Sequence, residues 1–314
     1  MDSEENAKGK LKQYKKQKLI GTGGGGEVYL CLDQIHNREV VVKSGLVGSS
    51  LNGVGMENLR ELKFFTELGI ADHPNFIKLY DCFFDRGKMN IVMERCRGDL
   101  CGLISNTDVT LSIATIKAIL FDVLSPLQYI HKRYIAHRDI KPENYLVGLD
   151  KRLRLSDFGL SRYVGTPRDH YTANVCTLFY RAPEILMESP LYTTSVDMWS
   201  VGCILGSMLL RAPLFLGAND KEVLYAMFFL LGTPTKKQWP EVETLPGYVE
   251  FNKTFEPKRP QSVFPNVPDD VLDLLYRMLD YNPQTRITAQ EALSHPFFTN
   301  DPPMTPFKDI PYWS

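Results

Sequence analysis

Residues able to do chemistry gather in one short stretch, His137-Arg138-Asp139-Ile140-Lys141-Pro142-Glu143-Asn144. A carboxylate, an ammonium and an amide at this spacing suit phosphoryl transfer from ATP to a hydroxyl, where catalysis is mostly positioning and charge neutralisation. Asp139 can orient the hydroxyl and accept its proton, and Lys141 can stabilise charge on the moving phosphate. The alternative is a charged surface loop that turns at Lys-Pro, which gives no reason for this spacing.

A second motif, Asp157-Phe158-Gly159, follows downstream and adds another carboxylate. Asn144 and Asp157 both offer oxygen ligands, which Mg²⁺ prefers while it also binds phosphate oxygens. We therefore expect ATP and Mg²⁺ as cofactors.

The composition excludes several other classes of protein. The chain has 314 residues, 44% of them hydrophobic, and a net charge of −1, which argues against a protein built to bind nucleic acid or an anionic membrane. The six cysteines form no Cys-x-x-Cys pair, so we do not expect bound zinc. We expect the protein to reside in a reducing intracellular compartment. The first twenty residues lack an apolar signal core, and the apolar stretch 196–210 is too short to span a bilayer.

The sequence pattern predicts mainly strands in the first part of the chain and helices in the rest. Apolar, β-branched runs predict strands over 14–20, 27–33, 38–43, 77–84 and 88–93, with one helix over 56–68. Helical spacing follows over 111–131, despite Pro126, and over 196–210, which is apolar all round and should be buried. Two further helices are expected over 272–279 and 288–293.

A Gly-x-Gly-x-x-Gly pattern, Gly21 to Gly26, lies between the first two predicted strands, and Lys43 ends the third. Glycines let backbone N–H groups approach phosphate without obstruction by Cβ atoms. A Rossmann turn would run from a strand into a helix, so the strand context favours a loop that covers phosphates.

These motifs, in this order, resemble those of eukaryotic protein kinases. The resemblance implies an α+β, bilobal fold, with a small five-stranded β lobe that carries one helix and a large, mainly α lobe. The implied division is a mobile N-terminal tail (1–13), a small lobe (14–95), a large lobe (96–298) and a C-terminal tail (299–314).

The resemblance assigns roles to individual residues. Lys43 would hold the α- and β-phosphates with Glu61 as its ion-pair partner, because Arg60-Glu61 matches the end of the helix by which cyclin-dependent kinases contact cyclins; Glu57 and Glu67 compete for this role. His137 would be structural, hydrogen-bonded near Asp157. Asp197 would brace the catalytic loop, and Glu184 would pair with Arg286.

The nucleotide pocket implied by the resemblance combines the glycine loop, a roof and a hinge. Met93 would gate the pocket, backbone groups of Glu94 and Cys96 would pair with adenine, and Asp99 would lie near the ribose. The full set is Ile20, Gly21, Thr22, Gly23, Gly24, Gly25, Gly26, Glu27, Val28, Val41, Lys43, Met93, Glu94, Cys96 and Asp99.

The family's activation switch has counterparts here. Thr172 lies where the family is phosphorylated, and Thr166-Pro167 offers a second site. A phosphate adds roughly two negative charges and needs cationic partners, here Arg60, Arg138 and Arg162. The alternative is three unrelated surface arginines.

Further motifs indicate the subfamily. Lys141, two residues after Asp139, fits serine/threonine kinases, and Tyr180 to Glu184 resembles the proline-directed group, in which Arg181 shapes the pocket after the phosphoacceptor. The stretches 232–240, 245–249 and 298–306 resemble the cyclin-dependent-kinase-activating kinases. Those kinases pair with cyclin H, work with an assembly factor and phosphorylate the RNA polymerase II tail, which implies a nuclear or cytoplasmic location and no direct binding of nucleic acid or membrane.

The sequence departs from the family pattern in three places. Gly24-Gly25 replace the inhibitory Thr-Tyr phosphosites, Val41 replaces the usual alanine of the adenine site, and Tyr145 replaces the leucine after the catalytic asparagine. Another cyclin-dependent or MAP-like kinase is an alternative, although the MAP kinases' dual activation site is missing. The alternative from another class, a pseudokinase scaffold, would usually lack its counterpart of Lys43, Asp139 or Asp157.

Overall fold

The computed structural model describes residues 12–23, 26–45, 56–67, 73–85, 87–164 and 178–310, with backbone alone for 56–59 and 67. The chain forms two compact units: Met1–Gly98 with Leu146–Leu160, and Asp99–Tyr145 with Ser161–Ser314. Leu146–Leu160, which the predicted division placed in the large lobe, therefore packs with the first unit.

The first unit is built on an antiparallel five-stranded sheet in the order β1-β2-β3-β5-β4. The strands are β1 (Tyr14–Gly23), β2 (Gly26–Asp33), β3 (Arg38–Gly45), β4 (Leu79–Asp85) and β5 (Lys88–Glu94). All five predicted strands are present, and β1 and β2 extend further than predicted, pairing Gly23 with Gly26. Gly26 has a φ of +116° and a Cβ there would clash with the carbonyl oxygen of Ser44, so this position requires glycine.

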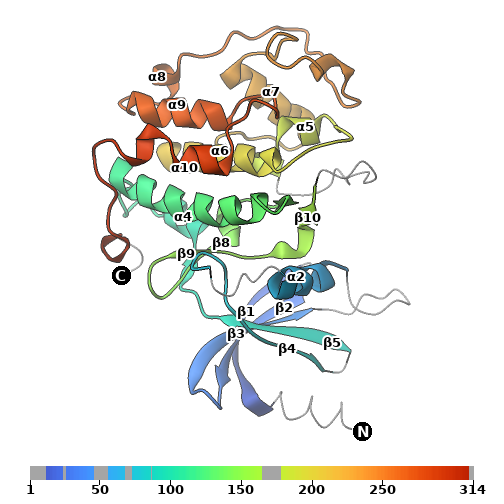
Figure 1. Cartoon of the computed structure of the whole chain (residues 1–314), viewed down its shortest axis with the longest axis vertical. Helices are drawn as coiled ribbons and strands as arrows, with labels where there is room; N and C mark the ends of the chain where they lie inside the picture. Colours follow the sequence, from blue (N-terminus) through green and yellow to red (C-terminus); the bar gives the residue numbers. More distant parts are fainter. Residues whose placement is uncertain are drawn as a thin grey trace. The chain divides into compact units, whose positions relative to one another are not determined.

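Among the described residues of this unit, the helix that accompanies the sheet is α2 (Met56–Glu67), drawn beside the strands in Figure 1. The β-branched run of β3 fills the core of the sheet with Val40 and Val42, which pack with Val92 of β5. The helix predicted over 56–68 is present over 56–67, and residue 68 lies outside the described residues.

The second unit is mainly helical. Its helices are α3 (Leu100–Ser105), α4 (Ile113–His131), α5 (Pro183–Leu186), α6 (Ser195–Leu210), α7 (Asp220–Leu231), α8 (Pro260–Val263), α9 (Asp269–Met278) and α10 (Ala289–Leu293). Figure 1 shows α6 running beside α4 and α9. Nearly every side chain of α6 is buried, as its uniformly apolar sequence predicts.

Short strands and turns frame the loops between these elements. β7 (Ile135–Ala136) pairs with β10 (Arg162–Tyr163), and β6 (Gly98–Asp99), β8 (Tyr145–Val147) and β9 (Leu153–Leu155) form a small sheet. Single 3₁₀ turns cover Pro142–Asn144 and Phe158–Leu160.

Helix α4 starts two residues later than predicted, because the side chain of Ser112 caps its N-terminus by accepting a hydrogen bond from the Thr115 N–H. It continues through Pro126, as predicted. Among the described helices, α4 is long and apolar enough to cross a membrane by length and composition, but 67% of that stretch is buried inside the protein.

Candidate active site

Lys43, Glu61 and Asp157 come together within the first unit. Lys43 Nζ lies 2.9 Å from Glu61 Oε2 and 3.7 Å from Asp157 Oδ1. Burial raises the pKa of Glu61, the nearby Lys43 ammonium opposes that rise, and the Asp157 charge adds to it. Lys43 therefore bridges two carboxylates, and its predicted ion pair with Glu61 is present; the side chains of Glu57 and Glu67 lie outside what the structure describes.

Aromatic packing holds α2 where Glu61 can reach Lys43. The ring of Phe158 lies 6.2 Å from that of Phe64 and 5.5 Å from that of Phe65, both on α2, and 5.7 Å from that of Phe76. Arg60 adds a hydrogen bond of 3.5 Å to the Gly159 carbonyl. The Asp157-Phe158-Gly159 motif thus positions the helix that carries the partner of Lys43.

Asp139, Lys141 and Asn144 come together within the second unit. Lys141 Nζ lies 2.8 Å from Asp139 Oδ2, and Asn144 Nδ2 donates to the same oxygen at 2.9 Å and to the Asp139 carbonyl at 2.7 Å. The other carboxylate oxygen, Oδ1, is buried and has no hydrogen-bond partner among the described residues. An unsatisfied buried acceptor is costly, so this oxygen suits a donor brought by a substrate.

Asp197 of α6 braces the backbone of this loop, as predicted. Its Oδ2 accepts from the His137 N–H at 2.8 Å, and its Oδ1 accepts from the Arg138 N–H at 2.8 Å. Arg138 has a φ of +69°, a conformation that these two hydrogen bonds help to hold. His137 is fully buried and its Nδ1 accepts from the Asp139 N–H at 3.3 Å, so its role is structural.

The carboxylate of Asp197 stays ionised despite complete burial. Burial alone would raise the pKa of Asp197, but a 2.8 Å contact with His131 Nε2, the nearby His137 and the Arg138 N–H together hold that pKa below its usual value. The sequence reasoning missed His131, whose signal was a histidine in the last turn of α4, shortly before the catalytic loop.

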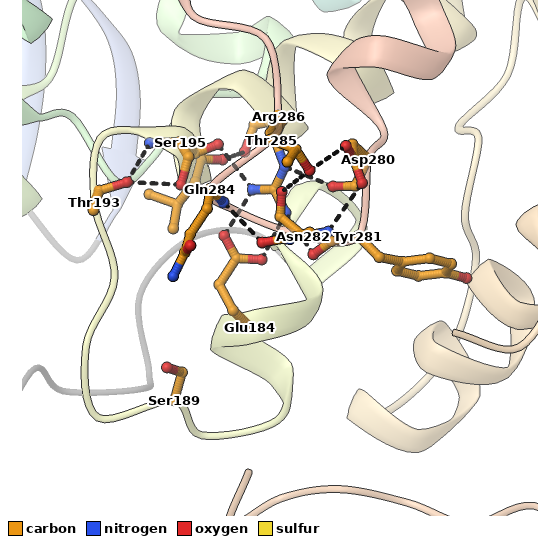
Figure 2. A network of polar contacts seen from close by, with 12 residues as sticks. Glu184, Ser189, Thr193, Ser195, Asp280, Tyr281, Asn282, Gln284, Thr285 and Arg286 are labelled. Carbon is orange, nitrogen blue, oxygen red and sulfur yellow. Dashed lines mark hydrogen bonds and ion pairs between the residues drawn. The ribbon is translucent and has the colours of Figure 1, made fainter. Parts of the chain in front are cut away.

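Glu184 and Arg286 form the predicted buried ion pair. The guanidinium bonds both carboxylate oxygens, at 2.7 and 2.9 Å, and neither side chain is more than 1% exposed. Figure 2 shows Arg286 surrounded by further acceptors, the carbonyls of Ser195, Asp280 and Tyr281. This satisfied network ties α5 to the chain before α10.

The predicted nucleotide-pocket residues fall on β1, β2, β3 and β5 and the segment after β5. Val41 of β3 pairs directly with Met93 of β5, so the residue predicted to line the adenine site lies beside the residue predicted to gate the pocket. Gly24 and Gly25 lie outside the described residues. Burial raises the pKa of Cys96 to about 12, so its thiol stays protonated. Asp99 has a role that was not predicted: its side chain caps α3, accepting from the Gly102 N–H at 2.8 Å.

Two of the three predicted phosphate-binding arginines, Arg138 and Arg162, lie in the second unit. Arg162 pairs across the strands with Ala136, two positions before Arg138. Thr166 and Thr172 lie outside the described residues, so the switch stays a prediction. Arg181 forms an ion pair of 3.2 Å with Asp220 at the start of α7.

The sequence matches the family described as protein kinase domain over residues 14–298. The chain belongs to the protein kinase family. It is 38% identical over 299 residues to cyclin-dependent kinase D-1 of Oryza sativa subsp. japonica, covering 95% of this chain and 70% of that one. It is also 38% identical over 309 residues to cyclin-dependent kinase 7 of Xenopus laevis, covering 98% of this chain and 87% of that one.

A solved structure, of the CAK complex from Chaetomium thermophilum bound to ATP-gamma-S, superposes with a TM-score of 0.90 at 33% identity, covering 98% of this chain and 97% of that one. The α+β kinase fold is therefore confirmed, with its five-stranded sheet and helical second part. The protein is a serine/threonine kinase of the cyclin-dependent type that uses ATP.

Proposed function

We propose that this kinase is a cyclin-dependent-kinase-activating kinase that also phosphorylates the RNA polymerase II tail. Its substrates would be serines or threonines, often followed by proline, and its partners a cyclin H-like protein and an assembly factor. Similarity to cyclin-dependent kinases 7 and D-1 along most of the chain supports this proposal. The observation that supports catalytic activity is the intact set of Asp139, Lys141 and Asn144, in which one carboxylate oxygen of Asp139 has no hydrogen-bond partner among the residues that the structure describes.

In this mechanism, Asp139 Oδ1 accepts the proton of the attacking hydroxyl. Lys141, 2.8 Å from the other oxygen, holds the carboxylate in place and offsets charge on the transferred phosphate. Lys43, held by Glu61, binds the phosphates of ATP. Arg181 would shape the pocket for the residue after the phosphoacceptor.

Asn144 and Asp157 fit Mg²⁺ by the chemistry of their donor atoms. Magnesium prefers oxygen ligands, and the Asn144 amide nitrogen donates to Asp139, which assigns the amide oxygen as the ligand. When bound, the ion would neutralise charge on the phosphates.

We also propose that phosphorylation of Thr172 activates the enzyme, with Thr166 as a second site. Arg138 and Arg162 both lie in the second unit, where Arg162 pairs with Ala136 two positions before Arg138, and they would supply two of the expected cationic partners. Thr172→Ala should sharply reduce turnover, and an unchanged turnover would remove this switch from the account. We place the protein in the nucleus or cytoplasm, which imaging of a tagged full-length chain would test.

The experiment measures phosphate transfer to a Ser-Pro heptad peptide and to an unactivated cyclin-dependent kinase, with and without a cyclin H-like protein, beside Asp139→Asn. Cyclin-stimulated transfer to both substrates, lost in the variant, supports the proposal. Transfer to the peptide alone would move the enzyme elsewhere in the proline-directed group. ATP binding without any transfer would make it a scaffold.

A further inference from the structure

Tyr145 directly follows Asn144 and connects the catalytic loop to α4. Its backbone N–H donates to the Pro142 carbonyl and closes the 3₁₀ turn that contains Asn144. Its side chain is completely buried, and the hydroxyl donates to the Val123 carbonyl of α4 at 3.1 Å. Burial raises the pKa of the Tyr145 phenol, and the Asp197 carboxylate raises it further, so the hydroxyl remains a donor. Tyr145 thus holds the end of the catalytic loop through two hydrogen bonds, one from its backbone N–H and one from its side-chain hydroxyl.

The acceptor lies on a turn of α4 that a proline disturbs. Pro126 has no N–H to offer the carbonyl four residues earlier, so α4 cannot form that intrahelical hydrogen bond, next to the Val123 carbonyl. Hydroxyl groups supply donors around this turn: Ser125 Oγ donates to the Phe121 carbonyl at 2.8 Å, and Tyr145 to that of Val123. The proline turn and the tyrosine therefore form one local arrangement.

The catalytic loop is consequently held at both ends. At its start, Asp197 accepts the N–H groups of His137 and Arg138. At its end, the Asn144 amide reaches back to Asp139, so any movement of the 3₁₀ turn changes the position of the Asp139 carboxylate. A leucine at position 145, usual in the kinases that this sequence resembles, could not form the second attachment because it has no donor.

We propose that the Tyr145 hydroxyl is a positioning group for catalysis, which holds Asn144 and, through it, Asp139 in their working geometry. Loss of this hydrogen bond should weaken the hold on the loop without disturbing the surfaces that recognise the peptide. The expected signature is a lower kcat at an unchanged KM for the peptide.

The test compares Tyr145→Phe with the full-length wild-type kinase in the presence of its cyclin. Removing one buried hydrogen bond should lower kcat about five- to tenfold, with KM for the peptide within about twofold. Because Asn144 is a proposed Mg²⁺ ligand, the gain in ATP affinity on adding Mg²⁺, measured by calorimetry, should also shrink. That binding readout does not depend on turnover or on the identity of the physiological substrate.

Ser125→Ala is the matched control, since it removes a hydroxyl from the same turn of α4 without touching the loop. It should lower the melting temperature by a similar amount and leave kcat unchanged. Incorporation of 3-fluorotyrosine at position 145, which keeps the hydroxyl, should keep the wild-type kcat and serves as the test if Tyr145→Phe does not fold. An unchanged kcat in Tyr145→Phe, equal losses in both variants, or a low kcat with 3-fluorotyrosine would overturn the proposal.

Discussion

The two sets of proposed catalytic residues are built in different ways. Lys43, Glu61 and Asp157 lie on separate elements and meet through ion pairs that depend on where α2 packs. Asp139, Lys141 and Asn144 lie within a few residues of one another and are joined by hydrogen bonds inside one loop. A shift of α2 would separate the first set, whereas the second set is fixed by the core of its own unit. We therefore expect regulation of the kinase activity to act through the position of α2. The geometry of Asp139, Lys141 and Asn144 should stay the same in the active and inactive states.

Asp139→Asn attacks the second set and should have the largest effect. The amide keeps the shape of the side chain but cannot accept the hydroxyl proton, so turnover should fall about 1,000-fold. Steady-state phosphate transfer to a Ser-Pro peptide measures this loss. ATP affinity and melting temperature serve as controls and should match those of the wild type; a variant with more than a tenth of wild-type turnover would exclude Asp139 as the base.

Glu61→Gln attacks the first set. Lys43 would lose its ion pair with Glu61, while the Asp157 carboxylate lies 3.7 Å away. Turnover should fall about 10- to 100-fold, chiefly through a lower kcat/KM for ATP. The ATP dependence of the initial rate measures it. Glu57→Gln, on the same helix, is the matched control and should change the rate by less than about twofold. Equal losses in the two variants would contradict the assignment of Glu61.

Glu184→Gln separates stability from chemistry. It leaves the buried Arg286 guanidinium without its counter-charge, which should lower the free energy of unfolding by about 3–5 kcal/mol. Denaturant unfolding measures this loss, and turnover per folded molecule should change far less than in Asp139→Asn. Glu243→Gln removes the exposed partner of Lys236 and should have a small effect by comparison. A similar loss in both variants would show that the buried pair has no special role.

Asp197→Asn should show a smaller effect that depends on pH. The folded-state pKa of Asp197 lies below the usual 3.8, so its ionised form stabilises the fold above that pH, and this stabilisation is lost as pH falls through the folded value. The difference in unfolding free energy between wild type and variant should therefore narrow as pH is lowered from neutral to below 3.8. A difference that stays constant or grows on acidification would contradict the ionised brace.

Residues belonging to short motifs could be predicted from the sequence. The Lys43–Glu61 and Glu184–Arg286 pairs and the brace from Asp197 are present as predicted, because the motifs that resemble those of protein kinases placed these residues in matching positions. The five strands and the long helices could be predicted from apolar periodicity, and their observed ends differ from the predicted ends by a few residues.

Contacts that depend on tertiary packing could not be predicted. Lys117 is 1% exposed and donates to the carbonyls of Asn300 and Pro302, although a lysine in a helix usually indicates a solvated face. Leu146–Leu160 packs with the first unit, a result of long-range contacts that no local pattern encodes. The sequence showed Tyr145 only as a replacement of the leucine that is usual at this position in protein kinases. Its hydrogen-bond acceptor, the Val123 carbonyl of α4, is known only from the fold.

The most direct test of the account is the single-turnover rate of phosphate transfer at saturating ATP and Mg²⁺, measured with and without the cyclin partner. It compares wild type, Glu61→Gln and Asp139→Asn. The account predicts that the cyclin raises the wild-type rate strongly and restores part of the rate of Glu61→Gln, because both effects act through α2, while Asp139→Asn stays inactive in either state. Transfer by Asp139→Asn at a rate close to that of the wild type would contradict the account.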